Sequence, residues 1–456
     1  MRRSRININR VSVVGLGKLG FSMAVAFAKR GFRVSGMDVN EHVLRRIRSG
    51  VSPVDETDTR KLLIRHRSRI RVCATVAEAM ADSDIIFVIV ATPSRRDGAF
   101  SDTQLIEAME AIGPALRARQ DYPVIAVTCT VMPGTIERAV KPLLERLSGR
   151  TCGRDFGLAY NPEFIALGSV VRDVLNPDFV LVGECDARAG ATLERFYHRA
   201  CENRPAVVRM KPIEAEIAKI SLNCFCTTKI AFANMLAEIA ERSPGADAGV
   251  IANAIGLDKR IGRRYLAPGL GFGGPCFPRD NVAFRVFAER LGVKAPIPAA
   301  VHASNQTQPR RVVARVRRIL PSGGRVAVLG LSYKPQTSVT TESQAMDIVS
   351  ALARDRRYSV QVYDPMATEN ARKVLGNAVG YAGSIAVCLR GADVCILAVP
   401  WPTFVTISAA TFIGNMRAPR VLDCWQCLSP ATRRRLAGYM AVGLGDAALR
   451  RPLPAR

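Results

Sequence analysis

The sequence lacks the features of a membrane or secreted protein. Its 456 residues contain no uninterrupted apolar run of about 18 residues, the length that a membrane-spanning helix needs. The basic start of the chain runs directly into a strand-like segment, without the apolar stretch of about 7–15 residues and the small-residue cleavage site of a secretory signal. We therefore expect a cytoplasmic protein that does not associate with membranes.

Histidine is scarce, and cysteine is present without a pattern. The four histidines, His42, His66, His198 and His302, lie on segments that we expect to be exposed helices, so no catalytic histidine is expected. The twelve cysteines are scattered rather than spaced as a disulfide framework, which favours reduced thiols. The CxxC spacing at Cys424–Cys427 has no second pair and no nearby histidine, which argues against a metal site.

Acidic residues are few relative to basic ones. The 65 Lys and Arg residues outnumber the 39 Asp and Glu residues and give a formal net charge of +26. The basic residues are mostly arginines spread along the chain, and no segment resembles a DNA recognition helix or an RNA-binding signature with interleaved aromatics. We therefore expect no nucleic-acid partner. A positive field would instead attract small molecules that carry phosphate groups.

Alternating strand-like and helical segments occupy both ends of the chain. From residue 11 to about 208, short β-branched runs alternate with amphipathic segments, which predicts a parallel sheet with helices on both faces. The same alternation resumes at about residue 325. The expected fold class is therefore α/β, with two doubly wound, Rossmann-like domains joined by a long central helix and a helical middle domain.

The long helix is predicted to begin at Pro212. Proline suits a first helical turn, and apolar residues recur at helical spacing until Pro244 and Gly245 end the pattern. Glu214 and Glu216 would favour the N-terminal dipole of this helix. The expected division is an N-terminal domain over residues 1–208, a central helical domain over 209–310 and a C-terminal α/β domain over 311–456.

A glycine pattern after the first strand indicates a dinucleotide site. The segment GLGKLG at residues 15–20 follows this strand and opens a helical pattern. Gly15 permits a tight turn, Gly17 lets the backbone approach a pyrophosphate, and Gly20 allows close packing of helix on strand. Asp38 ends the next strand, where a carboxylate can hydrogen-bond a ribose diol and would repel a 2′-phosphate. The expected cofactor is therefore NAD rather than NADP.

A glycine-rich loop in the middle of the chain presents a cysteine. The segment GLGFGGPCFPRD at residues 269–280 has four glycines and two prolines within ten residues, which excludes a regular element. Such glycines let backbone N–H groups approach a ligand closely. Cys276, with Asp280 four residues later, is interpreted as an accessible nucleophile. A structural cysteine in a turn is the alternative that this segment by itself leaves open.

This loop closely resembles the active-site signature of the UDP-glucose/GDP-mannose dehydrogenase family, usually GYGGSCFPKD. Other segments match the family's motifs in the same order: TP at 92–93, TVMPGT at 130–135, NPEF at 161–164, EAEIAK at 214–219 with Asn223, and VLGLSYKP at 328–335. The similarity extends from Val11 to Gly443, nearly the whole chain. Ordered matches of unrelated motifs make coincidence very improbable.

The resemblance implies an NAD-dependent, four-electron oxidation at C6 of a nucleotide-activated hexose. Cys276 would trap the intermediate aldehyde as a thiohemiacetal, a second oxidation would give a thioester, and water would release the carboxylate. The segment IGLDKRIG at 255–262 looks more like the UDP-glucose branch than the GDP-mannose branch. The expected reaction is therefore UDP-glucose to UDP-glucuronate, with UDP-N-acetylhexosamines and GDP-mannose as alternative substrates.

The resemblance also assigns roles to individual residues. Lys219 and Asn223, four apart on one helix face, would stabilise an oxyanion. Asp280 would help to activate water, Glu163 would be the acid/base in thioester hydrolysis, and Thr130 would hold a water or the C6 oxygen. The expected catalytic set is Cys276, Lys219, Asn223, Asp280, Glu163 and Thr130; the NAD-binding set is Gly15, Gly17, Gly20, Asp38, Thr92 and Thr130; and the substrate-binding set is Glu163, Lys219, Asn223, Arg260, Tyr265, Gly273, Phe277 and Lys334.

The C-terminal domain is expected to bind the nucleotide sugar. Its glycine turn lacks GxGxxG, so no second dinucleotide is expected there, and with Lys334 it resembles the family's UDP-sugar site. By the same resemblance, Tyr265 and Gly273 would line the sugar and phosphates, and Phe277 would pack near the hexose. Arg260 resembles an arginine that reaches across a dimer interface to the partner's substrate. We expect a homodimer or higher homo-oligomer built on the long helix.

Several positions depart from the family's pattern. Lys18 and Leu19 stand where the family has an aromatic residue beside the cofactor, and Leu167 stands where it often has an acid. Thr341 replaces an arginine that would contact the cofactor. The loss of this arginine leads to the hypothesis of weaker or altered NAD affinity, which a normal dissociation constant for NAD⁺ would rule out.

Two other classes of protein compete with this interpretation. A two-electron hydroxyacid dehydrogenase shares the N-terminal domain and the helical middle domain. It uses no nucleophilic cysteine, however, and it has no C-terminal α/β domain as a third domain. A non-catalytic nucleotide-sugar or nucleic-acid binder would not require the intact set of Lys219, Asn223, Cys276 and Asp280. These features favour the nucleotide-sugar dehydrogenase over both alternatives.

Overall fold

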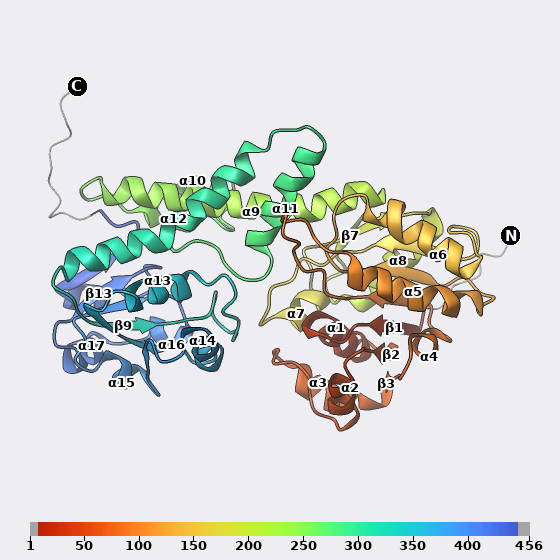
Figure 1. The fold of residues 1–456 in the computed structure, drawn as a ribbon, viewed down its shortest axis with the longest axis horizontal. Helices are drawn as coiled ribbons and strands as arrows, with labels where there is room; N and C mark the ends of the chain where they lie inside the picture. The colour runs from red at the N-terminus through yellow and green to blue at the C-terminus, as the bar shows by residue number, and fades with distance from the viewer. Residues whose placement is uncertain (1–7, 446–456) are drawn as a thin grey trace. The chain divides into compact units, whose positions relative to one another are not determined.

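The computed structural model describes residues 8–445 of the chain, which folds into two compact units (Figure 1). The first unit extends to Ser221 and the second begins at Leu222. Each unit contains one of the two predicted sheets. Within residues 8–445, no helix has both the length and the apolar character needed to cross a lipid bilayer.

The first unit is built on an eight-stranded sheet in the order β3-β2-β1-β4-β5-β6-β7-β8. The strands are β1 (Arg10–Val14), β2 (Arg33–Met37), β3 (Ile70–Val72), β4 (Ile85–Val88), β5 (Val124–Val127), β6 (Gly157–Tyr160), β7 (Phe179–Glu184) and β8 (Ala206–Met210). Neighbouring strands are parallel except β6 and β7, so the prediction of a wholly parallel sheet is wrong at this pair. The short helix α7 (Val170–Leu175) lies in the connection between these two strands.

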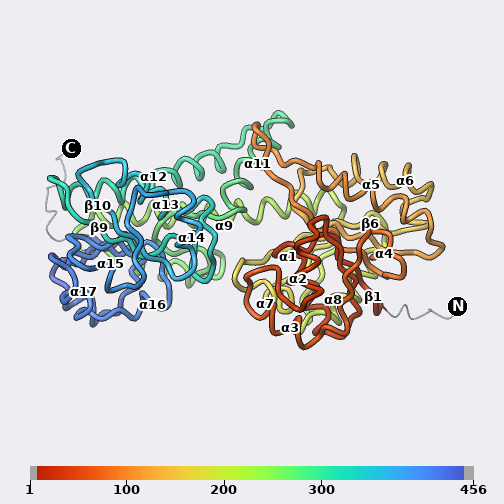
Figure 2. Tube along the Cα trace, turned by 60° about the horizontal axis from the view of Figure 1, so that its bottom comes forward, coloured from red at the N-terminus to blue at the C-terminus, as the bar shows by residue number. Residues whose placement is uncertain are grey.

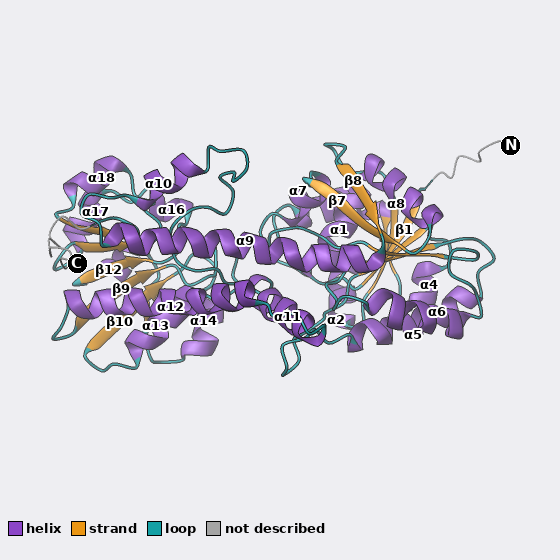
Figure 3. Cartoon of the chain, turned by 90° about the horizontal axis from the view of Figure 1, so that it is seen from above, coloured by secondary structure: helices purple, strands orange, loops and turns teal. Residues whose placement is uncertain are grey.

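Helices cover both faces of this sheet. They are α1 (Lys18–Lys29), α2 (Glu41–Arg48), α3 (Thr59–His66), α4 (Val76–Met80), α5 (Thr103–Arg117), α6 (Lys141–Ser148) and α8 (Ala187–Ala200). Figure 3 shows α1, α7 and α8 on one face and α4, α5 and α6 on the other, and Figure 2 shows α3 and α7 next to α1. In β1, Val13 packs in the core beneath α1 and α8, whereas Val14 packs in the core beneath α5 and α6. Both faces of the strands are therefore buried, as their apolar runs indicate.

The long helix α9 (Pro212–Glu241) confirms the predicted connecting helix and continues from the first unit into the second. Pro212 occupies its first position. The Glu214 carboxylate accepts the Lys211 N–H at 2.8 Å, which satisfies a donor at the start of the helix.

The second unit combines helices with a six-stranded, wholly parallel sheet in the order β11-β10-β9-β12-β13-β14. The strands are β9 (Gly324–Leu329), β10 (Tyr358–Tyr363), β11 (Gly380–Tyr381), β12 (Val394–Leu397), β13 (Arg420–Asp423) and β14 (Gly438–Ala441). The helices are α10 (Ala248–Ile255), α11 (Phe277–Arg290), α12 (Pro296–Ile319), α13 (Gln344–Ala353), α14 (Thr368–Leu375), α15 (Ile385–Leu389), α16 (Pro402–Val405), α17 (Ala409–Asn415) and α18 (Pro430–Arg435). Both sheets contain the doubly wound 3-2-1-4-5-6 order, which confirms the predicted fold class. The domain boundaries at residues 208 and 310 stay a prediction.

Two helices of the second unit differ from their prediction. The 24-residue α12 was not predicted, because Pro309 and many polar residues interrupt its apolar pattern. Helix α11 begins at Phe277, inside the segment 269–280 that was expected to contain no regular element, because Pro278 fits the first turn of a helix. This early start makes Cys276 the N-cap residue of α11.

Candidate active site

The first glycine turn has the geometry of a dinucleotide-binding loop. Gly15 has a φ of +96°, and a Cβ at this position would lie 2.0 Å from the Ile89 carbonyl oxygen. A Cβ on Gly20 would lie 1.9 Å from the Gly15 carbonyl oxygen, so α1 packs directly on the turn. Gly17 is the N-cap of α1, and a Cβ there would meet no described atom within 4 Å. The amino end of α1 therefore faces open space, where a pyrophosphate fits.

Asp38 adjoins this turn from the end of β2. Its carboxylate accepts the Leu16 N–H at 2.6 Å and the Asn40 N–H at 2.8 Å. The residue is only half-buried, and a carboxylate can accept further hydrogen bonds. The turn and Asp38 together fit the phosphates and the ribose diol of a dinucleotide.

The second unit repeats this turn, but its carboxylate is occupied. Gly330 follows β9 with a φ of +101°, and the Asp364 carboxylate, after β10, accepts the Leu331 N–H at 2.8 Å. Asp364 is buried, whereas Asp38 is not. The Asp364 carboxylate also accepts hydrogen bonds from Ser332, Met366, Ala367 and Trp401. The carboxylate oxygens of Asp364 are therefore already bound by residues of the protein. This supports the prediction that the second glycine turn binds no second dinucleotide.

Two loops at the carboxyl edge of the first sheet are tied to each other and to α9. Thr92, after β4, donates its hydroxyl to the Thr130 carbonyl, after β5, at 2.7 Å. The Glu216 carboxylate accepts the Gly134 N–H at 2.6 Å and the Ile136 N–H at 2.9 Å. Burial raises the pKa of Glu216 to about 7, and these two donors oppose the rise. The predicted role of Glu216 at the dipole of its own helix is wrong, because its side chain caps the helical segment that begins at Ile136.

The loop after β6 brings Glu163 beside Lys219 of α9. The Lys219 ammonium donates to the Glu163 carbonyl oxygen and lies 4.5 Å from the centroid of the Phe164 ring. Asn161 anchors the same loop by accepting the Tyr197 hydroxyl at 2.6 Å. Burial raises the pKa of the Glu163 carboxyl to about 7, and the Lys219 charge limits the rise. Glu163 can therefore exchange a proton near neutral pH.

Cys276 is exposed and lies at the start of α11. One turn further, Asp280 is buried, and its carboxylate accepts the Asn223 side-chain amide at 2.6 Å. Arg279 Nε lies 3.7 Å from the other carboxylate oxygen of Asp280. The amino end of a helix favours an anion such as a thiolate. The second unit thus gathers three of the predicted catalytic residues, and the first unit places Glu163 beside Lys219.

The loop that carries Cys276 packs against the second glycine turn. A Cβ on Gly273 would lie 2.2 Å from the Glu342 carbonyl oxygen, so this approach requires glycine. The glycine that follows faces the Tyr333 ring, where a Cβ would lie 2.5 Å from a ring carbon. The Lys334 ammonium is 5.9 Å from the centroid of the same ring. Lys334 and Gly273 therefore lie in adjoining loops, as a shared substrate site requires.

The other predicted substrate residues differ in their placement. The Tyr265 ring is half-exposed and lies edge-on to Phe277, with 5.9 Å between ring centroids. Tyr265 also has a φ of +63°, an uncommon conformation for a residue with a Cβ. Arg260 is exposed and pairs with Asp258 of its own turn at 2.6 Å. Within the described chain, the structure does not bring Arg260 to the other substrate-binding residues.

The departures from the family pattern have local structural roles. Thr341 is exposed, and its carbonyl accepts the Gly274 N–H at 3.1 Å, a contact that does not depend on its side chain. Leu167 is partly buried and packs against the apolar core of the first unit. The next residue, Gly168, donates its N–H to the Glu56 carboxylate at 2.7 Å. A leucine at position 167 therefore contributes packing to this loop.

The cysteine pair and the histidines have no part in these arrangements. Cys424 is buried, and the Cys427 thiol lies 3.5 Å from the Asp423 carboxylate. Among the residues that the structure describes, no group of three or more His, Cys, Asp or Glu side chains could hold a metal ion. The four histidines lie on α2, α3, α8 and α12.

Three buried polar side chains hold the loops of the site: Glu216, Asn234 and Asn305. Sequence reasoning gave Glu216 a different role and did not identify the two asparagines. Glu216 and Asn234 interrupt the apolar pattern of α9, and this signal could have indicated both. Asn305 gave no such signal, because its helix α12 was not predicted.

The doubly wound first sheet, its open glycine turn and Asp38 define a dinucleotide-dependent oxidoreductase. Models of the UDP-glucose/GDP-mannose dehydrogenase family match three parts of the chain: the NAD binding domain matches residues 9–201, the central domain 213–307 and the UDP binding domain 327–430. The chain belongs to the UDP-glucose/GDP-mannose dehydrogenase family, as its motifs predicted. NAD is the cofactor of its N-terminal domain.

Known proteins resemble this chain over most of their length. The UDP-glucose 6-dehydrogenase AglM of Haloferax volcanii is 34% identical over 400 residues, which cover 87% of this chain and 92% of that protein. The UDP-glucose 6-dehydrogenase TuaD of Bacillus subtilis is 30% identical over 448 residues, 97% of this chain and 94% of the relative. The solved structure of a UDP-glucose dehydrogenase from Pyrobaculum islandicum is 35% identical, with a TM-score of 0.88 over 98% of this chain and 100% of that chain.

Proposed function

We propose that the protein oxidises the C6 alcohol of UDP-glucose to the carboxylate of UDP-glucuronate. The overall change is one primary alcohol, two NAD⁺ and one water converted to one carboxylate, two NADH and three protons. The observation that carries this proposal is the exposed Cys276 thiol at the start of α11, one turn before the Asp280–Asn223 pair. The names of AglM, TuaD and the Pyrobaculum islandicum protein support UDP-glucose as the substrate.

Cys276 forms and releases the covalent intermediate in this proposal. Bound NAD⁺ supplies a hydride acceptor for each of the two oxidations. The Cys276 thiolate adds to the carbonyl carbon of the aldehyde, and the new C–S bond gives a thiohemiacetal whose oxidation yields a thioester. Water then attacks the thioester carbonyl, and the C–S bond breaks to return the thiolate. Covalent capture keeps the reactive aldehyde on the enzyme.

Charged and amide groups assist these steps. Lys219 and Asn223, one turn apart on α9, stabilise negative charge on the C6 oxygen. Glu163 acts as the acid/base of thioester hydrolysis, and Asp280 helps to activate the water. Thr130 holds a water or the C6 oxygen, and Arg260, Tyr265, Gly273, Phe277 and Lys334 bind the nucleotide sugar.

A substrate panel tests the proposed reaction. Purified protein is given NAD⁺ and, separately, UDP-glucose, UDP-N-acetylglucosamine, UDP-N-acetylmannosamine and GDP-mannose, and kcat/KM is measured from NADH formation. We expect UDP-glucose to exceed each of the others by at least about tenfold, because an N-acetyl group or another base must be accommodated by the same site. A preference for another sugar nucleotide would reassign the substrate, and no NADH with any of them would contradict the proposed activity.

The pH dependence of thioester hydrolysis should follow Glu163. Because burial raises the pKa of Glu163 to about 7, the deprotonated base forms as the pH rises through that value. The hydrolysis rate in a single turnover should therefore increase as the pH rises through about 7 and level off above that value. Glu163→Gln should remove this inflection. Glu216, whose pKa is also raised to about 7, is the control, and Glu216→Gln should keep the inflection even at a reduced rate. An inflection that survives Glu163→Gln but is lost in Glu216→Gln would show that Glu216, and not Glu163, is the group that titrates.

We also propose that α9 forms the interface of a homodimer. Phe225, Phe232 and Ile239 are spaced by seven residues on one helix face and are 67%, 45% and 53% exposed. Such a row of exposed apolar side chains is typical of a protein–protein contact. Arg260 follows α9 in the sequence, and its side chain is exposed. In this dimer Arg260 would be available to the partner's substrate.

Light scattering of purified variants tests the dimer. Phe232→Asp should shift the mass from dimer toward monomer, because a carboxylate in the interface would lose its hydration. Val374→Asp, which changes an apolar and 69% exposed residue of α14, should leave the mass unchanged. A monomeric wild-type protein, or a dimer that tolerates Phe232→Asp, would contradict this interface.

We infer that the reaction takes place in the cytoplasm. No disulfide joins the cysteines of residues 8–445, as a reducing compartment favours. Cell fractionation with an antibody to the protein tests this location, and recovery in a secreted fraction would contradict it.

A further inference from the structure

We propose that Asn234 and Asn305 are positioning residues for Cys276. Each side-chain amide binds both an N–H and a carbonyl group of the glycine loop that leads to the thiol, one from α9 and the other from α12. The two residues are 1% and 8% exposed. The proposal rests on the proposed role of Cys276 and adds the device that holds its loop in place.

Asn305 binds both backbone polar groups of a single residue, Phe272. Its Oδ1 accepts the Phe272 N–H at 2.8 Å, and its Nδ2 donates to the Phe272 carbonyl at 2.9 Å. This pattern copies the paired bonds between residues of neighbouring antiparallel strands. A Cβ on Gly271 would lie 2.1 Å from Asn305 Oδ1, so the preceding glycine is needed for the approach. The pair of hydrogen bonds that each asparagine makes with the loop is called a clamp below. The clamp at Asn305 fixes the backbone four residues before Cys276.

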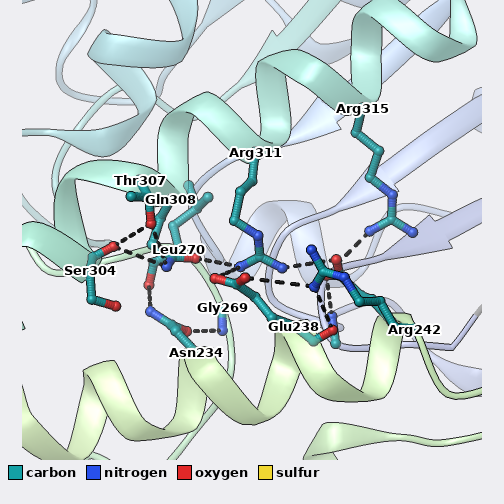
Figure 4. A network of polar contacts seen from close by, with 12 residues as sticks. Asn234, Glu238, Arg242, Gly269, Leu270, Ser304, Thr307, Gln308, Arg311 and Arg315 are labelled. Atoms are coloured by element: carbon teal, nitrogen blue, oxygen red, sulfur yellow. Dashed lines mark hydrogen bonds and ion pairs between the residues drawn. The ribbon is translucent and has the colours of Figure 1, made fainter. Parts of the chain in front are cut away.

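Asn234 holds the beginning of the same loop. Its Oδ1 accepts the Gly269 N–H at 3.0 Å, and its Nδ2 donates to the Leu270 carbonyl at 3.3 Å. Figure 4 shows Asn234 reaching from α9 toward Gly269, with Gln308 and Arg311 of α12 around the same segment. A Cβ on Gly269 would lie 2.5 Å from the Trp425 ring, so this ring packs directly against the backbone of the loop.

Ion pairs fix the two helices that supply the clamps. Arg311 of α12 donates to the Glu241 carboxylate of α9 at 2.9 Å. Figure 4 shows Arg311 beside Gln308, to whose amide oxygen it also donates, at 2.6 Å. Arg315, one turn further, lies 3.5 Å from the other Glu241 oxygen. Arg311 and Glu241 are about one-fifth exposed, so water screens the contact only in part. The spacing of Asn234 and Asn305 is therefore set by a braced helix pair.

The chemistry of the loop explains why amides serve here. A segment rich in glycine has many conformations to lose and no regular backbone partners of its own. A side-chain amide supplies one donor and one acceptor in a planar arrangement, which a carboxylate or an apolar side chain cannot do. Because α11 begins directly after Cys276, the path of this loop determines where the thiol lies. Neither asparagine needs to touch the substrate.

The test compares Asn305→Leu, Asn305→Asp and Asn234→Leu with the wild-type enzyme. Leucine removes both bonds at similar volume, and aspartate places an acceptor against the Phe272 carbonyl. We expect kcat to fall about tenfold or more in each variant, while KM for NAD⁺ stays within about twofold, because a displaced nucleophile slows chemistry without changing the cofactor site. Hydrogen exchange of the peptide over residues 267–277 should become at least about tenfold faster.

Asn415→Leu is the matched control, because Asn415 of α17 is half-buried and bonds to Thr411 of its own helix. It should leave kcat and the exchange of the loop unchanged. The proposal is overturned if the clamp variants keep wild-type kcat, or if kcat falls while loop exchange stays as in the wild type. If Asn305→Leu does not fold, Asn234→Leu decides by the same criteria. Loop exchange is measured without substrate. A wild-type protein without activity would therefore refute the proposed function, and hydrogen exchange would still test whether Asn234 and Asn305 hold the loop.

Discussion

Replacing Cys276 with alanine should lower the turnover number for UDP-glucuronate formation by about a thousandfold or more. Without the thiol, the aldehyde is not held as a thiohemiacetal, and the second oxidation loses its covalent intermediate. Cys276 is exposed at the N-cap of α11, so its truncation should leave folding and NAD⁺ binding intact. The measurement is the amount of carboxylate product by mass spectrometry, with NAD⁺ affinity determined separately.

Cys427→Ala serves as the control for this experiment. Its thiol lies in the same unit, half-buried beside the Asp423 carboxylate, and outside the proposed site. The variant should keep turnover within about twofold of the wild type. If Cys276→Ala forms UDP-glucuronate within about tenfold of the wild-type rate, the covalent mechanism is wrong, although the chain could still be an NAD-dependent dehydrogenase.

Replacing Lys219 with alanine should lower kcat by about a hundredfold or more, because a buried ammonium that stabilises a developing oxyanion is lost. The structure holds this ammonium against the Glu163 carbonyl and the Phe164 ring, so its position does not depend on substrate. The Lys219 charge also lowers the pKa of Glu163. The remaining activity of Lys219→Ala should therefore show its inflection at higher pH than the wild type.

Lys229 provides the matched control on the same helix. Its ammonium donates to the carbonyl oxygens of Ile261 and Gly262 at 3.0 Å, so it has a structural contact but no proposed role in the reaction. Lys229→Ala should keep kcat within about threefold and leave the pH profile in place. Equal losses in Lys219→Ala and Lys229→Ala would mean that α9 lysines act only through stability.

The strands were more predictable than the way they pair. Strand β5 (Val124–Val127) lies within the region of alternation predicted for residues 11–208, because a strand buried on both faces leaves a short β-branched run. Strand β8 leaves a weaker signal, because its side chains alternate in exposure at the edge of the sheet. The antiparallel pairing of β6 and β7 could not be read from either strand, because it depends on where the loop and α7 between them lie. The start of α11 needed only the proline rule applied to Pro278.

The site was predictable where its residues form a continuous motif. The turn at 15–20 and the loop at 269–280 follow from local glycine spacing, and the resemblance supplied the remaining residues. Contacts between distant residues were not accessible in this way. Asn223 and Asp280 are 57 residues apart in the chain, and Glu216 is 82 residues from the Gly134 N–H that it accepts. Such partners depend on which elements pack together, which a single sequence does not state.

The most direct test of the proposed four-electron oxidation is the number of NADH molecules formed for each UDP-glucose consumed. Purified enzyme is allowed to run to completion with limiting UDP-glucose and excess NAD⁺, and both NADH and the sugar products are quantified. A four-electron oxidation through a Cys276 thioester gives two NADH and one UDP-glucuronate per sugar. One NADH per sugar, with an aldehyde or ketone as the product, would contradict it.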